Sequence, residues 1–107
     1  MAYTTRIDWE PLRSINSAAL TGGYDALGTP LANPSYLLKV INNSTQDVFI
    51  SKDGATDIDV VPAGSFFLYD ETKTTKYEMV AARTQIYVKG TAGVGTIYLV
   101  TQYLVVG

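Results

Sequence analysis

The chain has 107 residues, which is enough for a single domain with its own core. Eight lysines and arginines stand against ten aspartates and glutamates, a formal net charge of −2, whereas a surface that binds nucleic acid needs clustered cations. The sequence contains neither cysteine nor histidine, which excludes disulfides, Cys/His zinc sites, thiol nucleophiles and Ser-His triads. These exclusions favour a role in binding or assembly over catalysis.

The start of the chain contains no apolar stretch of the kind found in secretory signals. The longest unbroken apolar run has four residues, against the roughly 20 that a membrane-spanning helix needs. We therefore expect a protein that is made in the cytoplasm and does not use a membrane as a partner.

Residues 1–35 lack any sustained alternation of apolar and polar positions and are punctuated by glycine and proline. One short helix is predicted over Pro11–Leu20, because Pro11 suits a first helical position and Gly22 and Gly23 would end the helix. The segment is nevertheless too apolar to be left in water, so we predict an extended N-terminal arm over residues 1–35 that lies on its own domain or on a neighbouring subunit. Its predicted partner-contact residues are Ile7, Trp9, Leu12, Ile15, Leu20, Tyr24, Leu27 and Leu31.

Short runs rich in Thr, Val, Ile and Tyr follow from residue 36 onward, with turn signals about every eight to twelve residues. This pattern predicts an all-β domain over residues 36–107, an antiparallel β-sandwich or a small barrel. The predicted strands are Tyr36–Asn42, Asp47–Ser51, Asp57–Val61, Ser65–Asp70, Lys76–Val80, Thr84–Lys89 and Thr96–Val105.

Two of these strands are apolar on both faces. In the first, Leu38 and Val40 alternate with Leu37 and Ile41, and in the last, Ile97 and Leu99 alternate with Tyr98 and Val100. In a sandwich of this size, one face of each sheet should be exposed to solvent and therefore polar. The second apolar face must therefore be covered by the arm, by a partner, or by both.

Three carboxylates, Asp53, Asp57 and Asp59, fall within seven residues. Clustered hard oxygens suit calcium, but the spacing is not that of an EF-hand loop, and solvated turn carboxylates explain the pattern more simply. With Glu78 they are also the only basis for an enzyme hypothesis, and none has a partner of identifiable catalytic role. Gly90–Gly95 is glycine-rich, but the helix that a phosphate cradle needs does not follow it. We predict no catalytic residue, metal or cofactor.

The chain has eight tyrosines, and Tyr87 and Tyr103 are predicted to face outward. Aromatic rows on a sheet can stack sugars or bases, although base-stacking proteins pair such rows with a positive groove that this sequence lacks. Packing in the core or at an interface accounts for most of the tyrosines, and glycan contact remains an alternative.

Four motifs stand out in the region after residue 36: the Asn42-Asn43-Ser44 turn, the Ile50–Gly54 hairpin, Val61-Pro62-Ala63-Gly64 and Ile86–Gly90. They resemble motifs of a family of small virion structural proteins of tailed bacteriophages. The resemblance covers about three quarters of the chain and implies a jelly-roll-like sandwich in a virion protein. It transfers no functional residue, because the shared motifs are turn chemistry.

Together these observations predict a non-enzymatic virion protein that decorates or cements a capsid by docking its β-sandwich and arm onto neighbouring subunits. The expected partners are the major capsid protein or other virion subunits, together with further copies of the chain in a dimer or trimer. A neck or tail adaptor, a fibre anchor and a host-glycan-binding module are the alternatives. The composition break near Pro34 predicts that a chain without residues 1–33 keeps a folded β-rich core.

Overall fold

A computed structural model describes residues 5–35, 37–70 and 81–106 of the chain. These residues form nine strands and one short 3₁₀ helix, so the all-β prediction is confirmed. The elements are β1 (Thr5–Trp9), β2 (Arg13–Asn16), η1 (Ser17–Ala19), β3 (Tyr24–Ala26), β4 (Leu37–Ser44), β5 (Val48–Ser51), β6 (Asp59–Val61), β7 (Phe66–Asp70), β8 (Tyr87–Lys89) and β9 (Gly95–Val106). The described part contains no helix long and apolar enough to cross a membrane.

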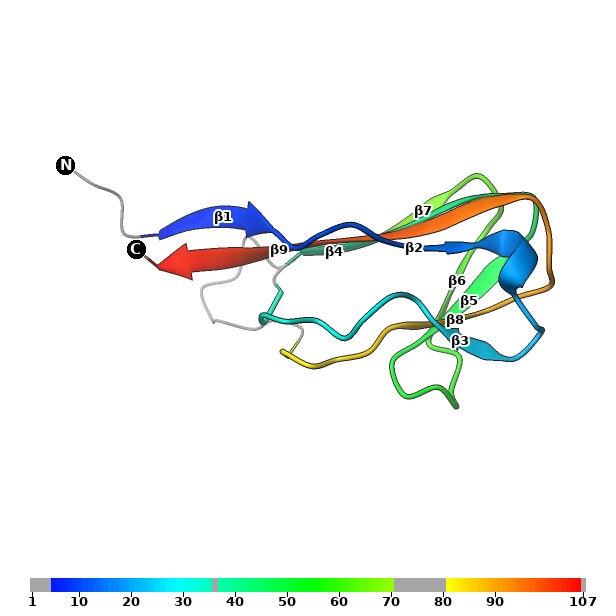
Figure 1. The fold of residues 1–107 in the computed structure, drawn as a ribbon, viewed down its shortest axis with the longest axis horizontal. Coiled ribbons are helices and arrows are strands. Elements are labelled where there is room, and N and C mark those ends of the chain that lie inside the picture. Colours follow the sequence, from blue (N-terminus) through cyan, green and yellow to red (C-terminus); the bar gives the residue numbers. More distant parts are fainter. Residues whose placement is uncertain (1–4, 36, 71–80, 107) are drawn as a thin grey trace.

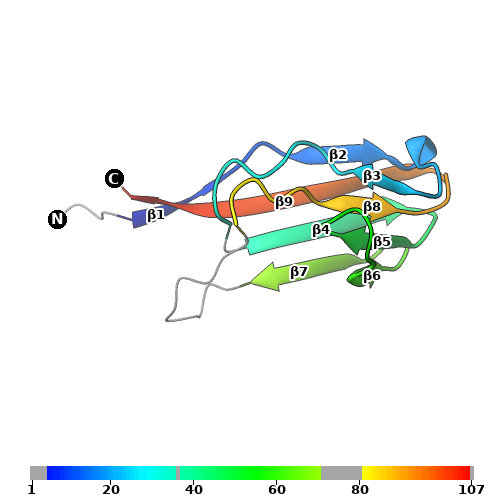
Figure 2. The same ribbon diagram turned by 90° about the horizontal axis from the view of Figure 1, so that it is seen from below.

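The strands form two antiparallel sheets that pack face to face (Figures 1 and 2). Sheet A has the order β1-β9-β4-β7, with β2 continuing along the same side of β9 as β1, and sheet B has the order β3-β8-β5-β6. From β2 onward the chain changes sheet at every connection except the β5–β6 hairpin. Eight strands alternating in this way between two four-stranded sheets make a jelly roll.

The core lies between the sheets and is entirely aliphatic. Sheet A contributes Leu38 and Val40 from β4 and Ile97 and Leu99 from β9, each at most 3% exposed. The remaining core residues are Leu20, Leu27, Leu31, Val48, Ile50, Val61, Ile86 and Val88. Three of the twelve therefore come from the segment that precedes residue 36.

The N-terminal segment is built into the sandwich of its own chain, which is the alternative in which the predicted arm lies on its own domain. β1 and β2 pair with β9, and β3 pairs with β8, so the segment supplies an edge to each sheet. The backbone N–H groups of Leu27 and Leu31 also donate to the carbonyl oxygens of Ile86 and Thr84, at 2.8 and 3.0 Å. Backbone pairing and core burial thus hold this segment within its own chain.

The predicted helix over Pro11–Leu20 is wrong. Residues 13–16 form β2, and only Ser17–Ala19 are helical, as a single 3₁₀ turn in which the Ala18 N–H donates to the Asn16 side chain. A ten-residue helix is marginal in water, and here the ladder with β9 provides a partner for the same backbone groups.

Most strands after residue 36 lie within two or three residues of their predicted bounds. The predicted strand Thr84–Lys89 is regular only over β8, because Thr84 and Ile86 pair with the N-terminal segment by isolated backbone hydrogen bonds. The predicted strand Lys76–Val80 lies outside the described residues.

The molecule is longer than a compact chain of its size. Its principal extents are 51 × 23 × 21 Å and its radius of gyration is 14.6 Å, against about 13 Å expected for this chain length. The elongation follows from β9, whose last residues pair with β1 beyond the end of β4 (Figure 1).

Candidate functional site

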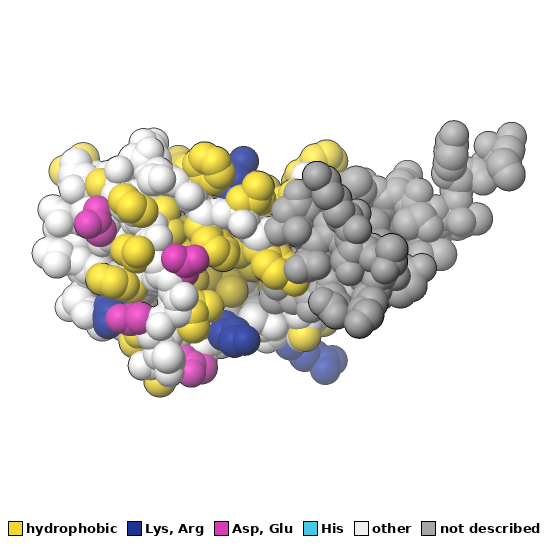
Figure 3. All heavy atoms as spheres, turned by 180° about the vertical axis from the view of Figure 1, so that it is seen from behind, with side chains coloured by type: hydrophobic (Ala, Val, Ile, Leu, Met, Phe, Trp, Pro, Cys, Tyr) yellow, Lys and Arg dark blue, Asp and Glu magenta, His cyan; other side chains and the backbone are white. Residues whose placement is uncertain are grey.

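Large exposed hydrophobic side chains in the described residues fall mainly into two groups. The first, here called the anchor, consists of Trp9 at the end of β1 and Leu12 just before β2, which are 58% and 61% exposed. The second, here called the β6–β7 edge, consists of Phe49, Ile58, Val60, Phe66 and Leu68. The side of the molecule that carries β6 and β7 has hydrophobic side chains spread between scattered charged ones (Figure 3).

A β-bulge explains why the anchor faces outward. Trp9 is paired with Gln102 and Arg13 with Leu99, so three residues on one strand stand opposite two on β9. Pro11 lies inside this bulge, where its missing N–H costs no ladder hydrogen bond. The extra residue changes the alternation, so that Trp9 and Leu12 are exposed while Glu10 and Arg13 are buried.

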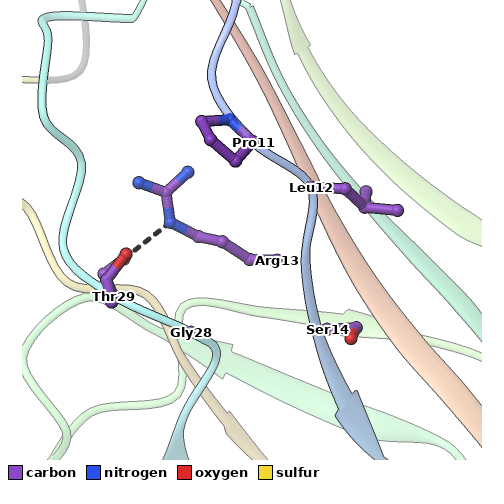
Figure 4. A pocket seen from close by; sticks show the side chains of 6 residues that line it. All are labelled: Pro11, Leu12, Arg13, Ser14, Gly28 and Thr29. Atoms are coloured by element: carbon purple, nitrogen blue, oxygen red, sulfur yellow. Dashed lines mark hydrogen bonds between the residues drawn. The ribbon is translucent and has the colours of Figure 1, made fainter.

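Glu10 and Arg13 form a buried ion pair beneath the anchor. The Arg13 Nη2 lies 2.7 Å from the Glu10 Oε1, and the two residues are only 8% and 7% exposed. Arg13 also donates from Nε to the Thr29 carbonyl at 2.7 Å (Figure 4) and from Nη2 to the Pro30 carbonyl at 3.0 Å. The guanidinium therefore joins the anchor segment to the strand-like segment that follows β3.

Glu10 and Arg13, here called the clamp, both bind the segment that follows β3, because the Glu10 carboxylate accepts hydrogen bonds from this segment as well. Its two oxygens accept hydrogen bonds from the backbone N–H groups of Ala32 and Asn33 and from the Asn33 side-chain amide, at 2.7–3.1 Å. Burial raises the pKa of Glu10, but the hydrogen bonds from Arg13, Ala32 and Asn33 outweigh burial, and the pKa lies below its ordinary value of 4.5. Glu10 is therefore ionised at neutral pH.

Gly28 makes room for the clamp. Its φ of +73° is unfavourable for other residues, and a Cβ at this position would lie 2.6 Å from the Arg13 Cβ. Beside it lies a hollow of about 370 Å³ lined by Pro11, Leu12, Arg13, Ser14, Gly28 and Thr29 (Figure 4). The only charged group of the lining, Arg13, is already neutralised by Glu10.

The anchor continues into the outer face of sheet A. Strand register aligns Trp9 with Gln102 and Leu37, then Val100 with Lys39 and Leu68, then Tyr98 with Ile41 and Phe66. These residues are half-buried or exposed, and Lys39 is the one cation among them, with its Nζ 6.0 Å from the centre of the Phe66 ring. The second apolar face predicted from the sequence is this outer face.

We compared the chain with protein-family models, with curated proteins and with solved structures, and none of the three comparisons finds a match. The case for a function therefore rests on the residues themselves.

The structure separates the residues predicted to contact a partner. Leu20, Leu27 and Leu31 are core residues, and Ile15 packs against that core. Only Trp9 and Leu12 are largely exposed. Ile7 lies in β1 opposite Leu104, and its side chain is not described. Tyr24 is half-buried on the outer face of sheet B.

Tyr24 belongs to a small cluster around Asp57. The Tyr24 hydroxyl donates to the Asp57 carboxylate, and the Lys89 Nζ lies 2.9 Å from the same group. Lys89 also lies over the rings of Tyr24 and Phe49, at 4.9 and 5.4 Å from their centres. Hydrogen bonds from Tyr24 and Lys89 lower the pKa of Asp57, and the hydrogen bond to Asp57 raises the pKa of Tyr24. The aromatic faces are thus partly occupied by the chain's own cation.

The three carboxylates between residues 53 and 59 are engaged separately. Asp53 caps its turn by accepting from the N–H groups of Ala55 and Thr56, at 2.8 and 2.9 Å, and from the Ser51 hydroxyl at 2.7 Å. These hydrogen bonds, the one from Ala55 foremost, hold the pKa of Asp53 far below its usual range. Asp59 accepts from the N–H of Val60. Residues 5–35, 37–70 and 81–106 bring no three potential metal ligands together, and Glu78 lies outside them.

The tyrosines predicted to face outward, Tyr87 and Tyr103, are both half-buried. The Tyr87 ring lies 3.4 Å from the position that a Cβ on Gly54 would take, so it packs against the turn after β5. Sequence reasoning missed the residues that orient the anchor, namely Glu10, Arg13 and Gly28. Pro11 was the available signal, because a proline next to a strand marks a bulge as readily as a helix start.

Proposed function

We propose that this chain is a non-enzymatic structural protein of a bacteriophage particle, which docks onto neighbouring virion subunits and decorates or cements the capsid. The observation that carries the proposal is the anchor: two large apolar side chains held outward by a bulge and a buried ion pair. Exposed aromatic and aliphatic side chains on a rigid base are typical of the residues that dominate binding at interfaces, because little freedom is lost on docking.

The fold and the sequence resemblance support the same proposal. Jelly rolls are common in viral capsid proteins, although lectins and cupins share the fold, so the fold alone does not decide the function. Two of the virion-protein motifs of the sequence lie at strand ends: Asn42–Ser44 are the last residues of β4, and Val61–Gly64 lead from the end of β6 into the following turn. The major capsid protein, or another virion subunit, is the partner that this proposal names.

The test uses purified particles of the phage that encodes the chain, with the gene for the chain replaced by variants. Trp9→Ala combined with Leu12→Ala should reduce the amount of the chain on purified particles at least tenfold, since loss of a dominant interface residue costs about 2 kcal/mol or more. Val94→Ala is the matched control, because Val94 is 74% exposed in the loop before β9 and lies outside the anchor.

Quantitative mass spectrometry of the particles separates the possible results. Many copies per particle, lost in the anchor variant and kept in the control, support a decoration or cement protein. A few copies per particle would instead place the chain at a neck or tail position. Absence of the chain from purified wild-type particles, or equal incorporation of the anchor variant, would refute the proposal.

A further inference from the structure

β2 lies at an edge of sheet A, on the side of the sandwich that carries the anchor. Within the part of the chain that the structure describes, β2 pairs with β9 alone. Successive residues of an antiparallel strand direct their backbone N–H and C=O groups alternately toward the partner strand and away from it. Half of the four residues of β2 therefore direct these groups away from β9, to the side on which Gly28 and Thr29 lie (Figure 4).

The hollow on this side of β2 has room for a bound segment. Its volume of about 370 Å³ falls in the range of ligand sites. Residues 11–14 line one side of it, and Gly28 and Thr29 line the other. Leu12, Ser14 and Thr29 are exposed, so the hollow is open to solvent. Its longer wall, four residues of nearly extended chain, measures about 10 Å, which is the length of a short strand.

One donor at this hollow has no acceptor. Arg13 lines the hollow and is only 8% exposed. Its Nε donates to Thr29, and its Nη2 donates to Glu10 and Pro30. Its Nη1 is buried and has no hydrogen-bond partner among the described residues. A buried donor without an acceptor destabilises a protein, so an acceptor oxygen placed beside Nη1 would be bound favourably.

Charge favours a neutral acceptor over an anion at this position. The Arg13 guanidinium is already paired with the Glu10 carboxylate at 2.7 Å, so an anion would be repelled by Glu10 as it approached Arg13. A backbone carbonyl oxygen accepts a hydrogen bond without carrying a charge. The hollow also continues into the anchor, because Leu12 belongs to both. A free strand edge, a free donor and exposed apolar side chains together suit an extended peptide.

We propose that an extended segment of the partner virion subunit pairs with the free side of β2, places a carbonyl oxygen beside the Arg13 Nη1 and packs an apolar side chain against the anchor. This inference rests on the proposed function and specifies how the partner is held. It is strand addition at a sheet edge, in which backbone hydrogen bonds supply affinity and alternate side chains supply specificity. Pro11 marks one end of the pairing, because it has no N–H to donate.

The first experiment measures access to the hollow. The chain has no cysteine, so Thr29→Cys introduces a single thiol at the hollow, and Thr91→Cys introduces one at an exposed threonine of the loop before β9. Mass spectrometry follows maleimide labelling of each variant, both as free chain and on purified particles. Thr29→Cys should be labelled at least about tenfold more slowly on particles, because the partner segment covers it. The labelling rate of Thr91→Cys should be the same in both states.

The second experiment fills the hollow. Thr29→Trp leaves the clamp in place, because Arg13 binds the backbone carbonyl of Thr29 and not its side chain. This variant should reduce the amount of the chain on purified particles about tenfold or more, the loss that follows when a dominant contact is blocked. Thr91→Trp is the matched control and should be incorporated like wild type. Circular dichroism checks that both variants keep the fold.

The third experiment tests the backbone pairing itself by hydrogen exchange, read by mass spectrometry on proteolytic fragments. The fragment that contains β2 should exchange more slowly on particles than in the free chain, because its free N–H groups become hydrogen-bonded. The fragment that contains Thr91 should exchange equally in both states. Slow labelling of Thr29→Cys without slower exchange in β2 would refute strand addition.

The remaining outcomes separate this inference from the proposed function. Normal incorporation of Thr29→Trp, with loss of the Trp9→Ala and Leu12→Ala variant, would refute docking in the hollow and leave the proposed function intact. Absence of the chain from wild-type particles would refute both. Labelling of free Thr29→Cys that slows as the chain concentration rises from about 1 to about 100 μM would show that a second copy fills the hollow, and would refute a partner segment.

Discussion

Replacement of Arg13 by methionine tests whether the buried clamp holds the N-terminal segment on the sandwich. Methionine keeps much of the volume of the arginine stem but removes the charge that neutralises Glu10. Removing one member of a buried ion pair costs about 3–5 kcal/mol, because the other charge remains buried. Glu10 keeps its hydrogen bonds from Ala32 and Asn33, so we expect the lower end, about 3 kcal/mol.

A loss of about 3 kcal/mol is a large part of the 5–15 kcal/mol typical of a whole domain. For a domain of about 100 residues it lowers the melting temperature by roughly 12 °C or more. Urea unfolding followed by circular dichroism measures the free energy of unfolding directly. Arg83→Met makes the same replacement at an exposed arginine and should change stability by less than about 0.5 kcal/mol.

A double-mutant cycle shows whether the loss comes from the unpaired charge. Glu10→Leu with Arg13→Met removes both charges. The backbone groups that lose hydrogen-bond partners in this double variant belong to residues 29–33, most of which are exposed, so these groups can bind water instead. The double variant should therefore be more stable than the sum of the single variants by at least 1 kcal/mol. The role of the clamp would be refuted if the two single substitutions had additive effects on the free energy of unfolding. It would also be refuted if the free energy of unfolding of Arg13→Met lay within 1 kcal/mol of the wild-type value.

Three further predictions follow from the same contacts. Acid should destabilise the protein, because the pKa of Glu10 in the folded state lies below its ordinary value of 4.5. The contribution of ionised Glu10 to stability is therefore present above about pH 4.5 and is lost as the pH falls through the folded-state pKa. Urea unfolding at pH 7 and at pH 3 measures this loss. Gly28→Ala should cost about 1–3 kcal/mol in the same assay, because both the positive φ and the Arg13 side chain oppose a Cβ. Deletion of residues 1–33 should abolish the cooperative unfolding transition, contrary to the prediction from composition, because it removes β1–β3 and the core leucines 20, 27 and 31.

The strands after residue 36 could be predicted because each is a short alternating run between strong turn signals, such as Lys52-Asp53-Gly54 and Pro62-Ala63-Gly64. The N-terminal strands could not, because β2 and β3 are three or four residues long and have no alternation of their own. Their conformation is imposed by β9 and β8, whose paired residues lie about 60 to 85 positions away in the sequence.

The candidate site shows a related limit. Eight apolar residues indicated that the N-terminal segment must be shielded from water. The sequence does not show whether an apolar residue is shielded by the core of its own chain or by a partner. Leu27 and Trp9 differ only in the structure, where one is fully buried and the other 58% exposed. The difference comes from the bulge at Pro11 and from the Glu10–Arg13 pair, which depend on a contact with residues 29–33 that no local pattern encodes.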